Sequence, residues 1–153
     1  MRRLAALAAS LVLAASFCDT AHAALMPIRS AVPGPLRSRP RLVTLGVDSS
    51  AVLGGFTSAH PTQQDLGGPA FGSLDWTVWN ARQGWAAGAE WINNCAPSCA
   101  QATYVPHKLK IHVYDPNSHG IFQHMKVMSG RTFSFHAMRL AAIGDLPAGW
   151  AWE

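Results

Sequence analysis

The sequence predicts an all-β domain, either a small antiparallel sandwich or a partly closed barrel, with one short C-terminal helix possible. Several segments alternate apolar and polar residues with a period of two, most clearly residues 107–114, where Leu109, Ile111 and Val113 share one face. Clusters of Gly, Pro, Asn and Asp separate these segments, as turns do. Helical periodicity is weak along the whole chain, so strands are the better prediction.

Residues 1–23 have the parts of a secretory signal peptide. Arg2 and Arg3 precede an apolar run over residues 4–17, and small residues at Ala21 and Ala23 flank a cleavage point. The run is shorter than the roughly 20 residues that cross a bilayer, and no later segment is longer. We therefore expect a secreted protein, cleaved near Ala23, with no transmembrane segment in the mature chain. A lipid anchor on Cys18 is disfavoured because the bulky Phe17 precedes it.

Residues 24–41 contain four prolines and four arginines among small residues, so we expect an extended, mobile spacer. The alternative is a basic arm attracted to anionic wall polymers or lipid headgroups. Residues 42–153 are enough for a single β domain. This part carries six basic and seven acidic residues. A nearly neutral exported domain lacks the basic face that nucleic-acid binding requires.

The first strands are expected at residues 42–47, 70–79 and 85–93. In the second of these, alternation places Leu74, Trp76 and Val78 on a buried face and Trp79 on the opposite, wetter face. In the third, one side carries two tryptophans separated by small residues: Trp85, Ala87, Ala89 and Trp91. The intervening residues 54–69 have the composition of loops.

The later strands are expected at residues 107–114 and 121–128, joined as a hairpin through a turn at residues 115–120. Residues 131–142 are ambiguous: Phe133 and Phe135 favour a strand, whereas residues 136–142 suit a short helix. A turn at residues 145–149 precedes the terminal Trp150-Ala151-Trp152.

Cys95 and Cys99 are the cysteines that follow the leader, and we expect them to form a disulfide in an oxidising exterior. So small a loop contributes about 2 kcal/mol by chain-entropy reasoning, enough to hold a turn in place. A redox-active pair and a metal thiolate site are the alternatives; the second lacks another cysteine pair to complete a tetrahedral set.

The chain resembles a group of small secreted actinobacterial proteins of unassigned function. The resemblance covers residues 71–128 and depends on the Trp76-x-x-Trp79 pair, the glycine-spaced strand after it, and the Asn93-x-Cys95-x-Pro97-x-Cys99-Ala100 loop. Asn80 stands where the group has glycine after the second tryptophan, and Ala102 replaces the glycine after the cysteine loop. The resemblance implies export and a β fold, and it transfers no active site.

The tryptophans suggest a possible ligand surface, because an exposed indole stacks on sugar rings. Trp76 is expected in the core, and Trp79, Trp150 and Trp152 are the candidates for the surface. We predict no metal, cofactor-binding or catalytic residues. The six histidines after the leader lack zinc-type spacing, and the calcium-like run from Asp115 places Lys126 where a bidentate Glu is needed.

These observations favour a secreted, noncatalytic β domain that acts as an interaction or structural module, with a cell-wall glycan or another exported protein as its partner. The alternative is a carbohydrate or wall-polymer binding module that uses the surface tryptophans. A small secreted hydrolase ranks third, because the sequence has no nucleophile elbow, phosphate-binding loop or dinucleotide fingerprint.

Overall fold

The computed structural model describes residues 24–27, 35–45, 51–95, 98, 103–139 and 147–153. These residues form strands and two single-turn 3-10 helices: β1 (Met26–Pro27), β2 (Leu36–Arg37), β3 (Val43–Leu45), β4 (Ala51–Gly54), η1 (Gln63–Asp65), η2 (Pro69–Phe71), β5 (Asp75–Trp79), β6 (Gln83–Asn93), β7 (Tyr104–Pro116), β8 (Phe122–Ser129), β9 (Arg131–Arg139) and β10 (Pro147–Trp152). The predicted all-β class is confirmed, and the sheet curls into a nearly closed antiparallel barrel.

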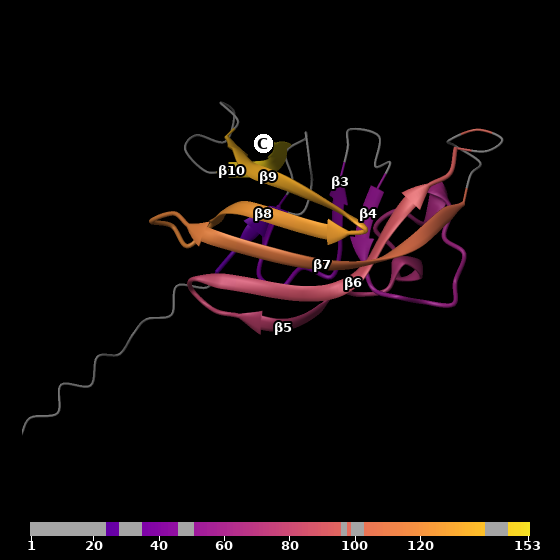
Figure 1. Cartoon of the computed structure of the whole chain (residues 1–153), viewed down its shortest axis with the longest axis horizontal. Coiled ribbons are helices and arrows are strands. Elements are labelled where there is room, and N and C mark those ends of the chain that lie inside the picture. Colours follow the sequence, from indigo (N-terminus) through magenta and orange to yellow (C-terminus); the bar gives the residue numbers. More distant parts are fainter. Residues whose placement is uncertain (1–23, 28–34, 46–50, 96–97, 99–102, 140–146) are drawn as a thin grey trace, which may run out of the picture.

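The main sheet has the strand order β10-β9-β8-β7-β6-β4-β3, and β5 also pairs with β6. Figure 1 shows β5 to β10 as successive ribbons, with β3 and β4 crossing behind them. β6 is long enough to have two partners on one edge: β5 pairs with its first half, and β4 pairs with its second half. This change of partner is the feature of the fold that positions the candidate site.

The hairpin of β7 and β8 forms where the sequence predicts it. Asp115 adopts φ 55°, and the side-chain oxygen of Asn117 accepts hydrogen bonds from the backbone N–H groups of His119 and Ile121, at 3.0 Å each. A polar side chain that satisfies turn amides in this way explains why this sequence reverses direction here. β6 and β7 pair over eleven consecutive residues, which makes them the longest ladder of the sheet.

The inner face of the barrel holds the main core, as the alternation on β7 predicts. Leu109, Ile111 and Val113 are buried together with Met125 and Val127 of β8. Phe135 and Trp150 bring β9 and β10 into the same cluster. β9 is a strand over residues 131–139, so the strand interpretation of this segment is confirmed there; residues 140–142 lie outside the described part.

A second, smaller cluster lies on the outer side of the sheet. The segment that contains η1 and η2 crosses over the second half of β6, and Phe71 packs edge-on against Trp91 and Tyr104, with ring centroids 5.9 and 5.0 Å apart. Val52 and Ala89 complete the cluster. Residues 54–69 are therefore not only loop: they include the end of β4, all of η1 and the first residue of η2, and they cover part of the sheet.

The prediction of a mobile spacer over residues 24–41 is wrong for its described parts. Ala24 and Met26 are buried in the main core, and β1 pairs with β2. The backbone of Leu25 also exchanges hydrogen bonds with Gly120 and Phe122, at 3.0 Å each. Proline and arginine content predicted mobility, but the few apolar side chains between them are enough to attach the segment to the barrel.

Candidate functional site

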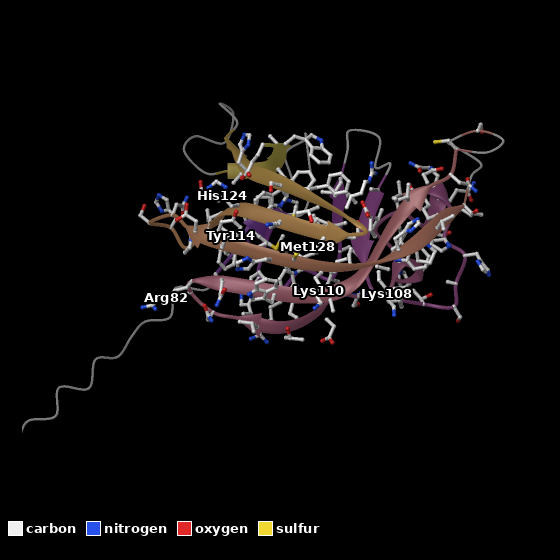
Figure 2. The ribbon with its side chains drawn as sticks, in the orientation of Figure 1. Arg82, Lys108, Lys110, Tyr114, His124 and Met128 are labelled. Carbon is white, nitrogen blue, oxygen red and sulfur yellow. The ribbon has the colours of Figure 1, made fainter. Side chains whose placement is uncertain are left out.

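The outer face of β6 and β7 carries small residues directly opposite lysines. Ala87 pairs with Lys110 and Ala89 pairs with Lys108, so that methyl groups lie beside long side chains across the ladder. On the other edge of β7, Lys110 pairs with Met128 of β8. Figure 2 shows Lys108, Lys110 and Met128 along these strands, apart from Tyr114 and His124 near the β7–β8 turn. The small residues on β6 leave this part of the face hollow.

The wall beside this hollow forms at the point where β6 changes its partner from β5 to β4. A Cβ atom on Gly88 would overlap the carbonyl oxygen of Gly54, so only glycine allows β4 to approach so closely. Gly72 has φ 67°, and a Cβ there would lie 2.9 Å from the backbone of Gly55. These contacts hold residues 55 and 72–73 against the sheet, which gives a wall of closely packed backbone.

Together these parts enclose a groove of about 580 Å³. Its volume falls within the roughly 300–1,000 Å³ typical of small-molecule sites. Phe56, 55% exposed, stands on the wall. The lining combines an apolar floor with a few polar and charged groups at the rim: Gly55, Phe56, Ser73, Asp75, Ala87, Gly88, Lys108, Leu109, Lys110 and Met128.

The charges of the groove are arranged by side. Lys108 and Lys110 are exposed on the β7 side, and Asp75 is exposed on the β5 side. Among the described residues, the ion pairs all involve His124, so neither lysine is neutralised by a carboxylate there. An anionic group in the groove would therefore be attracted toward β7 and repelled from Asp75.

A row of stacked rings occupies the outer face next to the groove. Trp85 stacks on His112 at a centroid distance of 3.9 Å, His112 on Tyr114 at 4.8 Å, and Tyr114 on His124 at 5.4 Å. Because His112 and Tyr114 each stack on two neighbouring rings, the middle of this row is not a free stacking platform. His124 is also held from both sides, with Nδ1 2.6 Å from Glu153 Oε1 and Nε2 3.5 Å from Asp115 Oδ2.

The protonation of His112 follows from its neighbours. Gln83 Oε1 accepts a hydrogen bond from Trp85 Nε1 at 3.2 Å and lies 3.1 Å from His112 Nε2. Because an amide oxygen only accepts, Nε2 carries the proton. Partial burial, and to a smaller extent the charge of Lys126, lower the pKa of His112 from its usual value. The neutral ring is therefore favoured in the folded protein.

The three tryptophans predicted for the surface have different environments. The prediction that Trp150 lies on the surface is wrong. Its side chain is 0% exposed, and its Nε1 donates a hydrogen bond to Pro27 O at 2.8 Å. It pairs with the small Ala137, which leaves room for the indole in the barrel. Trp152 is 57% exposed, and its ring contacts Phe135 at 4.3 Å and Phe133 at 5.3 Å. Ligand binding at Trp152 stays a prediction.

The placement of Trp79 on the wetter face is also wrong. The pairing register of β5 shifts between Trp76 and Val78, so that Thr77 is an extra residue in the strand. Trp76 and Trp79 therefore face the same side, where their rings meet edge-on at 4.5 Å and Trp79 contacts Phe122 at 5.4 Å. Trp76 is only half-buried, although it packs against the main core as expected.

The remaining candidates are partly outside the described residues. Cys95 is described and Cys99 is not, so their disulfide stays a prediction. Within the described ranges, no group of three or more His, Cys, Asp or Glu side chains is arranged to hold a metal ion. None of the helices in these ranges has the length and apolar character needed to span a bilayer.

Glu90 is buried and accepts a hydrogen bond from Ser129 Oγ inside the barrel.

The groove itself was not predicted from the sequence, because its lining comes from five separate segments. The one signal in the sequence was the run of four small residues, Ala86-Ala87-Gly88-Ala89, between Trp85 and Trp91. Comparison of the chain with protein-family models, with curated proteins and with solved structures finds no match.

Proposed function

We propose that the chain is a secreted, noncatalytic β domain that binds an anionic amphiphile in the groove between β5 and β7. The apolar body of the ligand would lie on Ala87 and Met128, beside Phe56, and its anionic group would lie beside Lys108 and Lys110. The observation that carries this proposal is the position of two unneutralised lysines at the rim of an apolar groove.

The backbone around the groove supports the view that the binding site is preformed. Its wall depends on glycine contacts between backbone segments, so little backbone rearrangement is needed when a ligand enters. Phe56 offers an exposed aromatic ring for apolar contact. The carboxylate of Asp75 on the opposite wall gives the ligand one preferred orientation.

The noncatalytic part of the proposal is supported by the sequence, which has no nucleophile elbow, phosphate-binding loop or dinucleotide fingerprint. The charged groups that line the groove among the described residues are two lysines and one aspartate, and such an arrangement suits attraction of a charged ligand. Export remains the expectation from the leader over residues 1–23.

Titration with three ten-carbon probes tests the binding proposal. Decanoate, decanol and decylammonium share one apolar chain and differ in charge, and calorimetry of the exported protein measures their affinities. We expect decanoate to bind most tightly and decylammonium least. Two exposed charges contribute modestly, so K108Q/K110Q should weaken decanoate binding by about three- to tenfold.

Lys126 provides the matched control, because it is an exposed lysine on the same face that does not line the groove. K126Q should leave the decanoate affinity unchanged. Failure of all three probes to bind would refute the groove as a ligand site. Equal affinities for decanol and decanoate would instead show that the groove binds apolar chains and that the lysines do not contribute.

A glycan or cell-wall polymer is the second candidate ligand, at a different place. The exposed Trp152 adjoins Phe133, whose ring lies 4.9 Å from the Arg131 guanidinium carbon. An indole beside a cation and aromatic rings is a suitable surface for a sugar face. Soluble wall glycans should shift tryptophan fluorescence of the native protein and not of W152A; no shift in either protein would reject this candidate.

Intact-mass measurement of the exported product under nonreducing conditions tests the maturation part of the proposal. If the leader is cleaved near Ala23 and Cys95 pairs with Cys99, the measured mass should equal that of a chain starting at Ala24, less two hydrogen atoms. A retained leader, or a mass with both thiols reduced, would contradict it.

A further inference from the structure

A second hollow, of about 400 Å³, is lined by three arginines from the end of β2 and the segment that follows it. Arg37, Arg39 and Arg41 are all exposed and occur within five residues. The other lining residues are uncharged, and they include Leu42, Thr44 and Gly67. A concentrated group of guanidinium ions in a hollow is the kind of surface that attracts an anion.

The arginines are presented by an anchored segment. Pro40 is buried, and its carbonyl oxygen accepts a hydrogen bond from Trp76 Nε1 at 2.8 Å. The carbonyl oxygen of Arg41 accepts from Leu74 N at 2.9 Å, and Arg41 Nε donates to Ser73 Oγ at 2.8 Å. Part of the ordering cost that a flexible basic arm would incur on binding is therefore already met in the fold.

Arg39 has an uncommon backbone conformation, with φ 46°. Side chains other than glycine, asparagine and aspartate seldom adopt this region, and the strain that results is often associated with functional positions. A glycine would satisfy the same turn at lower cost. The presence of a long cationic side chain at this position is accounted for if its guanidinium group has a ligand.

Among the residues that the structure describes, no acidic side chain lines the hollow and no ion pair involves any of the three arginines. The domain as a whole is nearly neutral, so this local excess is specific to the segment. The three cations repel one another across the hollow, and an anion bound between them would offset that repulsion.

We propose that this hollow binds a short chain of phosphate groups. Arginine forms two parallel hydrogen bonds with a phosphate, and its rigid fork suits that geometry better than lysine does. Successive phosphates carry closely spaced charges, so one chain can reach all three guanidinium groups, whereas a single carboxylate reaches one. This inference is independent of the groove between β5 and β7, because the hollow and the groove share no lining residue.

Calorimetric titration of the exported protein with tripolyphosphate tests the proposal. We expect tripolyphosphate to bind at least about tenfold more tightly than citrate or inorganic phosphate at equal ionic strength, with an affinity that falls as salt rises. R37Q/R39Q should weaken tripolyphosphate binding about fivefold or more. R82Q removes an exposed arginine outside the hollow and should change the affinity less than twofold.

Arg39→Gly separates binding from folding. Glycine accepts φ 46° without strain, so R39G should have a thermal midpoint no lower than that of the native protein while its affinity for tripolyphosphate falls. A merely structural Arg39 would give the opposite pair of results. Arg41 is left unchanged in these variants because its side chain also binds Ser73.

Three outcomes would overturn the proposal. Tripolyphosphate that does not bind, or binds no better than citrate, would remove the phosphate chain as the ligand. If R82Q binds tripolyphosphate as weakly as R37Q/R39Q does, the binding reflects nonspecific attraction to positive charge. Binding to phosphatidylglycerol vesicles that depends on Arg37 and Arg39, without binding of tripolyphosphate, would assign the arginines to a lipid surface instead.

Discussion

The two halves of the outer face of β6 have similar residues but differ in how far they are buried. Each half has a tryptophan and an alanine: Trp85 with Ala87, and Trp91 with Ala89. The second half is buried under η2, where Trp91 Nε1 donates to Gly55 O at 3.0 Å and Phe71 packs on the indole. The first half has no such cover among the described residues; Ala87 is exposed, and Trp85 is half-buried.

This difference shows that alternation in a strand assigns residues to a face without saying what covers that face. The cover comes from residues 61–71, which the pairing of β4 with β6 brings over the strand. The groove lies at the boundary, where the cover ends and the open half begins. The candidate site is thus a consequence of partial coverage.

The largest expected effect comes from removing the cover itself. Phe71 is 0% exposed, so F71A should lower the free energy of unfolding by about 3–5 kcal/mol through lost burial and a cavity. Phe56, on the exposed side of the same boundary, is the matched control, and F56A should cost less than about 0.5 kcal/mol. Urea denaturation measures both; equal losses would refute the contrast between the covered and open halves.

A smaller effect should distinguish the two tryptophans of the same face. W91F removes a buried hydrogen bond to Gly55 O and should cost about 1–3 kcal/mol. W85F removes a partly exposed hydrogen bond to Gln83, where water can substitute, and should cost less than about 1 kcal/mol. Thermal or urea unfolding of both variants measures this difference, and a W85F loss as large as that of W91F would indicate that both halves are covered.

The smallest effect concerns pH and the open half. The pKa of His112 is lowered in the folded state, so its neutral ring stabilises the fold above the usual histidine pKa of about 6.5. That contribution is lost as the pH falls from this value through the folded-state pKa. Stability measured between about pH 7 and pH 5 should therefore decline more steeply in the native protein than in H112Q.

His119 lies exposed in the β7–β8 turn and provides the control for this titration. H119Q should keep the slope of the native protein. If H112Q and the native protein decline in parallel, the desolvation of His112 by its stacked neighbours would be contradicted.

Local pattern predicted much of the fold. The hairpin from β7 to β8 formed as expected because its turn residues and its alternating core residues agree with each other. The shared face of Trp85, Ala87, Ala89 and Trp91 was also correct. In each case the information lies within a few residues of the chain, where strand geometry and turn chemistry act.

The errors arose where a distant segment or an irregular register decides the outcome. The extra residue at Thr77 reverses the face of Trp79, and no period-two pattern reveals such a bulge. Trp150 is buried in the main core, where its N–H donates to the carbonyl oxygen of Pro27, 123 residues earlier. The same contact contributes to the order of a segment whose composition suggested mobility. The groove and the arginine hollow both depend on contacts of this long-range kind.

Amide chemical-shift mapping during a decanoate titration tests the central claim most directly, because it locates the ligand on β6. We predict that the largest shifts occur at Ala87, Gly88 and Leu109, while the amides around Trp91 under the cover change little. Large shifts confined to the covered half, or spread evenly over the barrel, would contradict the account.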